Sequence, residues 1–504
     1  MTLSESGALP PSRVALARLH PSPEALRLIS FETAARLCVL PLTIAADGHL
    51  RVMAEEPRRL PCADELQTLT RRRVELIPST VPDLAAEIRR AYQFSGRIAC
   101  LSADYLHDER NDEAAPERLD DASPVSQIVE SMIAQAIGER ASDIHIEPGE
   151  KESRVRFRID GRLVDAVRFP AAIHRAVTAR VKIMAGMDIA ESRLPQDGRI
   201  LRDVDGRKVD FRISTLPSVR GEKTVLRLLD RERALRGLEG LGCEGAELAR
   251  IKNLLKIPNG IILNTGPTGS GKTTTLYAML ERLNLAEFNA VTVEDPVEYD
   301  IPGVTQVQVN ERSGLSFAVA LRSILRQDPD IVMLGEIRDG ETALLAVRAA
   351  LTGHVVLSTL HTNDAASAAL RLIDMGAPAF LVASALRGVM AQRLVRKLCP
   401  HCRQPYALPE RECERLELPR GSVFYRPVGC PRCDGRGYAG RTAIFEVLAV
   451  DEEISALIAR EESVSALRKA AVRKGMRTLE RGGIAKALAG VTSYEEVFGA
   501  IDVR

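Results

Sequence analysis

The stretch NGIILNTGPTGSGKTTTLYAML, residues 259–280, decides the fold of the central part of the chain. An apolar run at Ile261–Leu263 is followed by a glycine-rich turn and then by the spacing of an amphipathic helix. This order of strand, turn and helix is the context in which the Walker A pattern GxxxxGK[ST] forms a phosphate-binding loop. The sequence therefore predicts a nucleotide-binding α/β domain.

Each residue type in this loop has a chemical reason to be there. Glycines let the backbone curl so that its N–H groups point at the phosphates, and the helix N-terminus adds partial positive charge. Lys272 would lie near the β- and γ-phosphates, and the Thr273 hydroxyl could ligate Mg²⁺. The expected nucleotide-binding residues are Gly266, Pro267, Thr268, Gly269, Ser270, Gly271, Lys272, Thr273 and Thr274.

Acidic side chains follow two other apolar runs. Ile331–Leu334 is typical of a buried strand and is followed by Glu336, whereas Glu294 and Asp295 end the run in VTVEDPVE. The carboxyl ends of parallel strands meet at one edge of a sheet, so either acidic segment could hold the metal or a water. His361 ends a third run, and we hypothesise that it senses the γ-phosphate, although a lone histidine is more commonly a core or surface residue.

Arginines are candidates for meeting the charge of the transition state. Phosphoryl transfer commonly uses an arginine from a neighbouring domain or subunit. Arg322 and Arg326 lie four residues apart, which predicts that they share one helical face. Arg212 and Arg227 precede the phosphate loop in another part of the chain. For any single arginine, a solvated surface position is the simpler interpretation.

Four of the nine cysteines form two CxxC pairs with 27 residues between them: Cys399 and Cys402, then Cys430 and Cys433. Two such pairs complete a tetrahedral zinc site and leave no open position, so the metal would be structural. Disulfide pairing is the alternative. The paired spacing and the odd number of cysteines favour a reducing compartment over a secreted disulfide framework.

Length and composition narrow the class of protein. A chain of 504 residues predicts three or more domains, and 45% hydrophobic with 27% charged residues is typical of a soluble globular protein. A formal net charge of +1 gives no global reason to expect nucleic acid or a membrane as partner. The first residues, MTLSESGALPPSRV, lack the apolar h-region that is typical of a signal peptide, and no apolar run approaches the roughly 20 residues that span a bilayer. We therefore expect a soluble cytoplasmic protein.

Changes in composition mark the parts that precede the phosphate loop. Residues 1–100 are typical of a small α/β or helical module. Eight acids and two arginines between residues 104 and 121 predict a flexible linker, with an acidic docking tail as the alternative. Ser123 and Pro124 then predict an N-cap and first helical residue, and Asp160-Gly161 predicts a hairpin. A mixed α/β domain is thus expected at 122–232.

Taken together, the motifs match a known family. GPTGSGKTTTLY, VTVEDPVE, LRSILRQDPDIVMLGEIRD, TGHVVLSTLHTNDA and the paired CxxC resemble those of the type II secretion and type IV pilus ATPase superfamily. ASDIHIEP and ESRLPQDGRI resemble the domain that precedes the motor in the same proteins, and the match covers 122–504. The cysteine quartet resembles the secretion and pilus-extension branches. Chain length and the N-terminal module favour the type II secretion branch, the E-proteins of the general secretory pathway.

The resemblance implies an α/β architecture with a RecA-like P-loop motor. The implied parts are an N-terminal docking domain (1–100), an acidic linker (101–121), a PAS-like α/β domain (122–232), the ATPase domain (233–395), a tetracysteine zinc subdomain (396–440) and a C-terminal helical subdomain (441–504). ATP, Mg²⁺ and Zn²⁺ are the implied cofactors. Glu336 resembles the catalytic glutamate, and Glu294 and His361 lie in the family's Asp and His boxes. Arg212 and Arg227 resemble arginines that reach the nucleotide from the smaller domain, while Arg322 and Arg326 come from the motor itself.

The resemblance also implies what the ATP is used for. The family forms hexameric rings, and residues 1–100 would dock on the cytoplasmic part of an inner-membrane platform protein. The implied activity is ATP hydrolysis that drives pseudopilus assembly and protein export, at the cytoplasmic side of the inner membrane and without direct membrane contact. A pilus-extension ATPase is the closest alternative. A nucleic-acid-linked motor would need a basic face and stacking aromatics, whereas aromatics are 4% of this chain.

Overall fold

A computed structural model describes residues 21, 23–45, 47–55, 60–79, 84–92, 96, 98, 101–103, 105–106, 123–204, 207–230, 237–283 and 285–501. By its internal contacts the chain divides into two compact units, residues 1–229 with 428–437 and residues 230–427 with 438–504. The linker expected at 101–121 lies largely outside the described residues, as do residues 1–20 of the expected docking domain.

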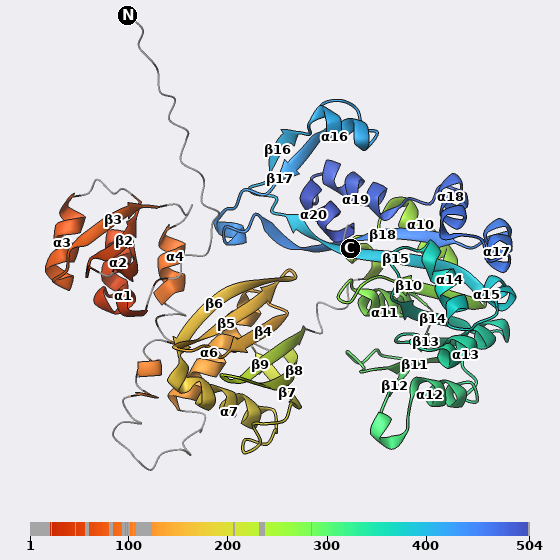
Figure 1. Ribbon diagram of the computed structural model, residues 1–504, viewed down its shortest axis with the longest axis horizontal. Coiled ribbons are helices and arrows are strands. Elements are labelled where there is room, and N and C mark those ends of the chain that lie inside the picture. Colours follow the sequence, from red (N-terminus) through yellow and green to blue (C-terminus); the bar gives the residue numbers. More distant parts are fainter. Residues whose placement is uncertain are drawn as a thin grey trace, which may run out of the picture. The chain divides into compact units, whose positions relative to one another are not determined.

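The N-terminal residues form a small α/β fold around a three-stranded sheet with the strand order β1-β2-β3 (Figure 1). β1 and β2 pair antiparallel, and β2 and β3 pair parallel. Leu40, Leu50 and Leu84 are fully buried. Of the two expected alternatives, the structure therefore has the α/β module. Its elements are α1 (Pro23–Leu28), α2 (Phe31–Leu37), β1 (Val39–Ile44), β2 (Leu50–Ala54), α3 (Leu60–Thr70), β3 (Val74–Pro78) and α4 (Leu84–Arg90).

The next domain is built on a six-stranded sheet with the order β6-β5-β4-β9-β8-β7. Its core contains Ile144, Phe157 and Phe211 of the sheet, packed with Val129 and Val177 of the helices. The elements are α6 (Pro124–Gly138), β4 (Asp143–Glu147), β5 (Glu152–Ile159), β6 (Arg162–Pro170), the 3₁₀ turn η2 (Ala171–Ile173), α7 (His174–Met184), β7 (Gln196–Val204), β8 (Arg207–Ser218) and β9 (Gly221–Asp230).

Two local predictions for this domain are confirmed. The Ser123 hydroxyl accepts a hydrogen bond from the backbone N–H of Ser126, and Pro124 is the first residue of α6. Asp160 and Gly161 have φ angles of 50° and 89°, the left-handed pair that a tight two-residue hairpin requires between β5 and β6. Both features follow from short-range rules, which is why the sequence alone predicts them.

The second unit contains a seven-stranded sheet with the order β12-β11-β13-β14-β10-β15-β18. All neighbouring strands pair parallel except β15 and β18, which pair antiparallel. The strands are β10 (Gly260–Thr265), β11 (Ala290–Glu294), β12 (Val304–Gln308), β13 (Ile331–Leu334), β14 (Val355–Leu360), β15 (Leu386–Leu398) and β18 (Tyr438–Ala449). The helices that precede or connect these strands are α9 (Gly237–Gly240), α10 (Gly245–Leu254), α11 (Lys272–Arg282), η3 (Glu311–Ser313), α12 (Phe317–Ile324), α13 (Gly340–Leu351), α14 (Ala366–Asp374) and α15 (Ala379–Ala385).

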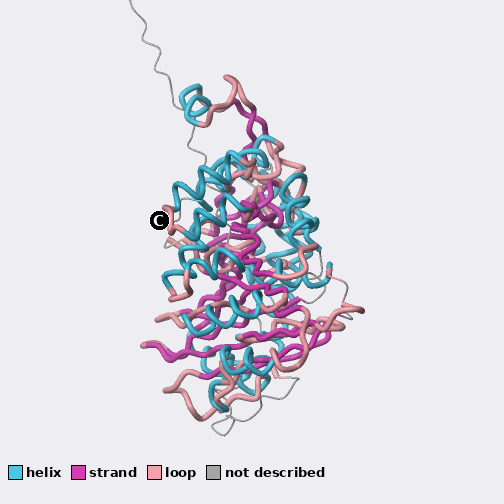
Figure 2. Tube along the Cα trace, turned by 90° about the vertical axis from the view of Figure 1, so that its right-hand side faces the viewer, coloured by secondary structure: helices cyan, strands magenta, loops and turns pink. Residues whose placement is uncertain are grey.

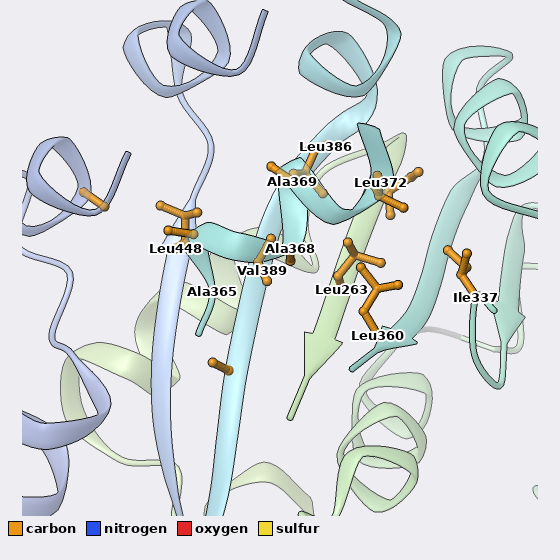
Figure 3. Packing of buried hydrophobic residues seen from close by; sticks show 14 of the residues in the cluster. Leu263, Ile337, Leu360, Ala365, Ala368, Ala369, Leu372, Leu386, Val389 and Leu448 are labelled. Carbon is orange, nitrogen blue, oxygen red and sulfur yellow. The ribbon is translucent and has the colours of Figure 1, made fainter. Parts of the chain in front are cut away.

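Helices cover both faces of this sheet (Figure 2). Side chains alternate along β10, so that Leu263 belongs to one hydrophobic core and Ile262 to the other, where it packs with Leu276 of α11. Figure 3 shows Leu263 in the first core, close to Ala369 and Leu372 of α14. Burial on both faces explains why residues 261–263 of β10 are a continuous apolar run.

The C-terminal part continues the same sheet before it becomes helical. Residues 441–449, expected in a helical subdomain, are instead strand residues of β18, and β15 extends past residue 395 to Leu398. The long β15–β18 pair thus joins the seven-stranded sheet to the cysteine region. The remaining elements are β16 (Gln404–Ala407), α16 (Glu410–Arg415), β17 (Val423–Arg426), η4 (Pro431–Cys433), α17 (Glu452–Ala459), α18 (Val464–Arg473), α19 (Leu479–Leu488) and α20 (Tyr494–Ile501).

Candidate functional site

The phosphate loop connects the end of β10 to the start of α11. Gly266 and Gly271 have φ angles of 152° and 88°, a region of backbone space that favours glycine. A Cβ atom on Gly266 would also lie 2.6 Å from the carbonyl oxygen of Gln392 on β15. The loop can therefore take this path only with glycine at these positions, as the Walker A pattern predicts. Thr273 and Thr274 are half-buried in the first turn of α11.

Lys272 turns back over the loop that precedes it. Its Nζ atom donates to the carbonyl oxygens of Gly266 at 2.7 Å and Pro267 at 3.3 Å, and lies 3.5 Å from Nδ1 of His361. Burial lowers the pKa of Lys272 to about 8, which the nearby carboxylate of Glu336 opposes and the guanidinium of Arg393 reinforces. The ammonium is thus held among loop oxygens in a partly desolvated place, which suits the binding of a phosphate.

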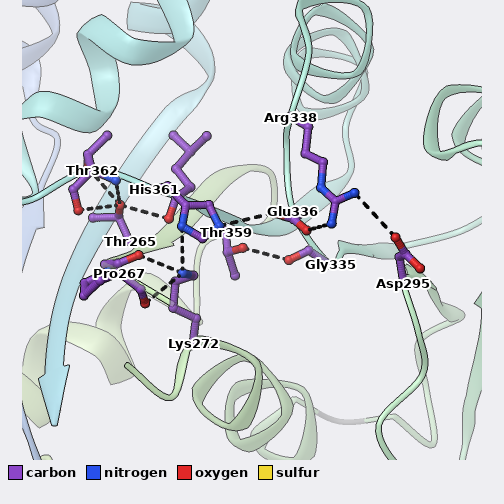
Figure 4. Close-up of polar contacts among 12 residues, drawn as sticks. Thr265, Pro267, Lys272, Asp295, Gly335, Glu336, Arg338, Thr359, His361 and Thr362 are labelled. Carbon is purple, nitrogen blue, oxygen red and sulfur yellow. Dashed lines mark hydrogen bonds and ion pairs between the residues drawn. The ribbon is translucent and has the colours of Figure 1, made fainter. Parts of the chain in front are cut away.

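Glu336 lies just beyond β13 and joins the lysine side of the site to the acidic end of β11 (Figure 4). Its Oε2 atom is 3.2 Å from Nε2 of His361, and its Oε1 atom forms an ion pair with Arg338. The Nη1 atom of Arg338 is in turn 3.5 Å from Oδ2 of Asp295. Residues from the ends of β10, β11, β13 and β14 therefore form one polar chain along the carboxyl edge of the sheet.

The surroundings of Glu336 keep its carboxylate charged. Partial burial acts to raise the pKa of Glu336, but the hydrogen bond and charge of Arg338, together with His361, outweigh it and leave the pKa below its ordinary value. The side chain is 20% exposed, so one part of it can still reach a ligand. A charged carboxylate at this position can orient a water or the hydration shell of a metal.

Glu294 has surroundings of a different kind from those of Glu336. Its side chain is buried, with one oxygen accepting from the Tyr277 hydroxyl and the other from Thr292 Oγ1 at 2.6 Å and Gln306 Nε2 at 3.1 Å. In VTVEDPVE the acid that is connected to Glu336 is Asp295, because both carboxylates contact Arg338. Burial and the neighbouring Glu294 raise the pKa of Tyr277, so the phenol keeps the proton that it donates.

Short hydrogen bonds tie the phosphate loop to the loop after β14. The Thr265 hydroxyl accepts from the backbone N–H of Thr362 at 2.7 Å and lies 2.8 Å from the Thr362 hydroxyl. Thr359 Oγ1 donates to the carbonyl oxygen of Gly335 at 2.8 Å. Sequence reasoning did not single out Thr265, Thr362 or Arg338. All three lie within the quoted stretches, and this is the signal that could have found them.

The two arginines of the motor domain are not arranged as predicted. α12 ends at Ile324, so Arg326 lies beyond the helix, and the prediction that it shares a helical face with Arg322 is wrong. Asp328, with a φ of 51°, and the proline after it end the helical path. Arg322 forms an ion pair with Glu341, while Arg326 Nη1 donates to the carbonyl oxygen of Arg322 at 2.8 Å.

The other two arginines lie on the six-stranded sheet of the first unit. Arg212 is on β8 and Arg227 is on β9. The Nε atom of Arg227 is 3.2 Å from Oδ1 of Asp143 on the adjacent strand β4. An arginine that is to reach a nucleotide must first leave its ion pair, here the one with Asp143. Arg227 is accessible, because 65% of its side chain is exposed.

The four paired cysteines converge as a zinc site requires. The sulfur atoms of Cys399, Cys402, Cys430 and Cys433 all lie within 4.8 Å of one another. Thiolates that bind one zinc tetrahedrally at about 2.3 Å would be about 3.8 Å apart. The Cys430 and Cys433 sulfurs are 3.7 Å apart, which is far beyond a disulfide bond of about 2 Å. Backbone N–H groups of Cys430 and Gly437 point at the Cys433 sulfur, each at 3.2 Å, and would stabilise a thiolate. These residues fit a structural zinc.

A glycine-rich phosphate loop after β10, with a carboxylate and a histidine from the ends of neighbouring strands, defines a P-loop nucleotide-binding domain of the α/β class. The family model described as type II/IV secretion system protein matches residues 118–499, and the chain belongs to this family. A second model, of the MshEN domain, matches residues 9–98. The family indicated by the motifs is thereby confirmed.

Individual relatives agree with this assignment. The chain is 52% identical to the type II secretion system protein HxcR of Pseudomonas aeruginosa over 377 residues, covering 75% of this chain and 77% of the relative. It is 49% identical to the type II secretion system ATPase E of Vibrio cholerae over 380 residues, or 75% of each chain. It is also 42% identical to the type IV pilus assembly ATPase PilB of Myxococcus xanthus over 490 residues, covering 95% of this chain and 86% of the relative.

Solved structures share the fold. The pilus retraction motor PilT with bound ADP matches with a TM-score of 0.51 and 26% identity, covering 74% of this chain and 96% of that one. The ATPase DotB of Legionella pneumophila matches with a TM-score of 0.57 and 22% identity, covering 74% and 94%. Among the helices of the described residues, none has both the length and the apolar character that a bilayer crossing requires.

Proposed function

We propose that the chain hydrolyses ATP and that this hydrolysis drives protein export by a type II secretion system. The observation that carries the proposal is the convergence of Lys272, His361 and Glu336 at the carboxyl ends of neighbouring parallel strands. A cation for the phosphates and a charged carboxylate for the attacking water are the two groups that phosphoryl transfer needs at this edge. Family membership and relatives named as type II secretion proteins support the use of the energy for export.

Each side chain of the site has a part in this proposal. Residues 266–274 would hold the phosphates through backbone N–H groups and Lys272, and the Thr273 hydroxyl would ligate Mg²⁺. Magnesium supplies positive charge to the phosphate oxygens when it is bound. Glu336 would orient the attacking water, since Arg338 and His361 keep its carboxylate ionised. Glu294 would act through the residues that it positions, since both of its oxygens already accept hydrogen bonds.

The proposal includes an assembly. The active form would be a hexameric ring at the cytoplasmic side of the inner membrane, in which Arg212 and Arg227 complete the nucleotide site. Residues 1–100 would contact the cytoplasmic part of a platform protein, and domain closure on ATP would move that platform to extend a pseudopilus. The functional parts proposed are those expected from the sequence at 1–100, 101–121 and 122–232, followed by an ATPase domain from residue 233 whose sheet includes β15 and β18, a zinc subdomain between these two strands and a helical part after β18. Zinc would hold the four paired cysteines together.

A second candidate is the extension of a type IV pilus. The observation that favours it is coverage: the pilus assembly ATPase of Myxococcus xanthus matches 95% of this chain, whereas the secretion relatives match 75%. Identity favours secretion, at 49% and 52% against 42%. Both candidates use the same chemistry on different machines.

Two variants test the chemistry in the purified full chain. Lys272→Ala should abolish nucleotide binding and turnover, because the phosphates lose their main counter-ion. Glu336→Gln should keep binding and lower kcat on the order of a hundredfold or more. Lys469→Ala, on the exposed side of α18, is the matched control and should behave as the native chain. Native turnover in Lys272→Ala would refute the site.

A deletion strain separates the two machines. It would be complemented with the native gene or with Lys272→Ala, and both the proteins in the medium and the surface pili would be scored. Loss of secreted proteins with pili intact supports the secretion proposal and ties it to ATP. Loss of pili with secretion intact assigns the same chemistry to pilus extension.

A further inference from the structure

Arg393 lies directly behind the phosphate loop and is 5% exposed. It is on β15, the strand beside β10. Its Nη1 atom donates to the carbonyl oxygen of Gln392 at 3.1 Å, and its Nη2 atom donates to that of Asn363 at 2.9 Å. A Cβ atom on Gly266 would lie 3.2 Å from Nη1. The guanidinium therefore occupies the space between the first glycine of the phosphate loop and the loop that follows His361.

The charge of Arg393 lacks a close counter-ion. Among the described residues no carboxylate forms an ion pair with it, and its buried Nε atom has no hydrogen-bond partner. The two acids near it are engaged elsewhere. Asp364 forms an ion pair with Arg468, and Glu446 accepts from the backbone N–H groups of Ala365 and Leu479. A buried cation in this state is costly unless an anion approaches it.

The same strand also supports the helix that follows the loop. Gln392 is 1% exposed, and its Oε1 atom accepts from Asn264 Nδ2 at 2.9 Å and Thr275 Oγ1 at 2.8 Å. Asn264 precedes the loop on β10, and Thr275 follows it on α11. Gln392 thus contacts the residues on both sides of the phosphate loop, and Arg393, the next residue of β15, donates to the loop that follows His361.

We propose that Arg393 is a nucleotide-positioning residue, whose buried positive charge is balanced by the phosphates of the bound nucleotide. Its Nη1 atom donates to the carbonyl oxygen of Gln392, which lies against Gly266, and its Nη2 atom donates to the loop that follows His361. The guanidinium would therefore fix how the His361 loop lies relative to the first glycine of the phosphate loop. This inference rests on the proposed function, because it takes the loop to bind nucleotide. It adds a residue that acts through the loop backbone and the electric field, without direct contact with the nucleotide.

The test is equilibrium binding of fluorescent ATP and ADP analogues to the purified full chain. Arg393→Met removes the charge at similar length and should weaken binding of both analogues by roughly tenfold or more, the scale of one poorly screened charge at short range. Arg393→Lys keeps the charge and should recover most of that affinity. Arg396→Met is the matched control on the same strand, where the native arginine pairs with Glu496 and stacks on Tyr438. It should lower the melting temperature and leave nucleotide affinity unchanged.

The outcomes separate this inference from the proposed function. Native affinity in Arg393→Met, with binding abolished in Lys272→Ala, overturns the role of Arg393 alone. Binding retained in Lys272→Ala overturns the nucleotide site itself. Equal loss in Arg393→Lys and Arg393→Met overturns the claim about charge. If Arg393→Met does not fold, Arg393→Gln replaces it as the neutral variant, with the same expectation relative to Arg393→Lys.

Discussion

The imidazole of His361 lies between two charged groups of the site, with Nε2 3.2 Å from Glu336 and Nδ1 3.5 Å from Nζ of Lys272. One ring thus spans from the phosphate-binding cation to the carboxylate that would orient the attacking water. We propose that His361 senses the γ-phosphate and transmits its presence to Glu336, because one ring nitrogen contacts each of the two groups.

Replacing this ring should separate binding from turnover. In His361→Ala, Lys272 and the phosphate loop remain, so nucleotide affinity should change little. Glu336 loses one of the groups that hold it, and kcat should fall on the order of tenfold to a hundredfold. Steady-state hydrolysis and analogue binding measured on the same preparation check this split. Loss of affinity with an unchanged kcat would contradict it.

The pH dependence of turnover should depend on Arg338. The pKa of Glu336 is held below its ordinary value against the effect of burial, chiefly by Arg338, so the native carboxylate stays ionised as the pH falls through the ordinary range. In Arg338→Met the burial effect dominates and the pKa of Glu336 rises. The acidic limb of the pH–rate profile should therefore move to higher pH, with little change above neutrality. Arg348→Met, exposed on α13, is the control; an acidic limb that does not move would refute the assignment.

Nucleotide affinity should weaken as the pH rises above 8. The pKa of Lys272 is about 8 in the free protein, so a growing fraction of the side chain is neutral above that pH. Bound phosphates favour the ammonium and raise its pKa, which means that binding takes up a proton in this range. Calorimetry in buffers of different ionisation enthalpy should detect that proton at pH 8.5. Affinity independent of pH from 7 to 9.5 would contradict the prediction.

The buried contact between Tyr277 and Glu294 should matter for stability. Tyr277→Phe leaves a buried carboxylate oxygen without this donor, which costs about 1–3 kcal/mol of the free energy of unfolding. Chemical denaturation measures the change. Tyr425→Phe, on the half-buried strand β17, keeps the ring beside Arg403 and should cost much less. Equal effects of the two substitutions would show that the hydroxyl of Tyr277 has no special role.

Removing zinc should loosen the cysteine region and leave the phosphate loop in place. A strong chelator should lower the melting temperature of the native chain, and Cys430→Ser should start from the lower value and show no further response. Nucleotide binding should persist in both cases. A melting temperature that the chelator does not change, or purified native protein without bound zinc, would refute the structural metal.

Much of the fold was predictable because it depends on neighbours in the chain. The Ser123-Pro124 cap, the Asp160-Gly161 turn and the glycine loop before Lys272 each need only a few consecutive residues to define their backbone. The strand Ile331–Leu334 was predictable because burial on both faces demands an uninterrupted apolar run. These patterns also carried the family assignment, which the comparisons confirm.

The sequence by itself thus determined the class of fold, the phosphate loop and the family. Only the tertiary structure decided that Glu294 is enclosed by Tyr277 and Thr292, that Arg338 joins Glu336 to Asp295, and that Arg393 lies behind Gly266. The physical reason is distance along the chain. Local rules set the path of the backbone, whereas the burial and charge of a side chain depend on strands that come together only when the sheet has formed.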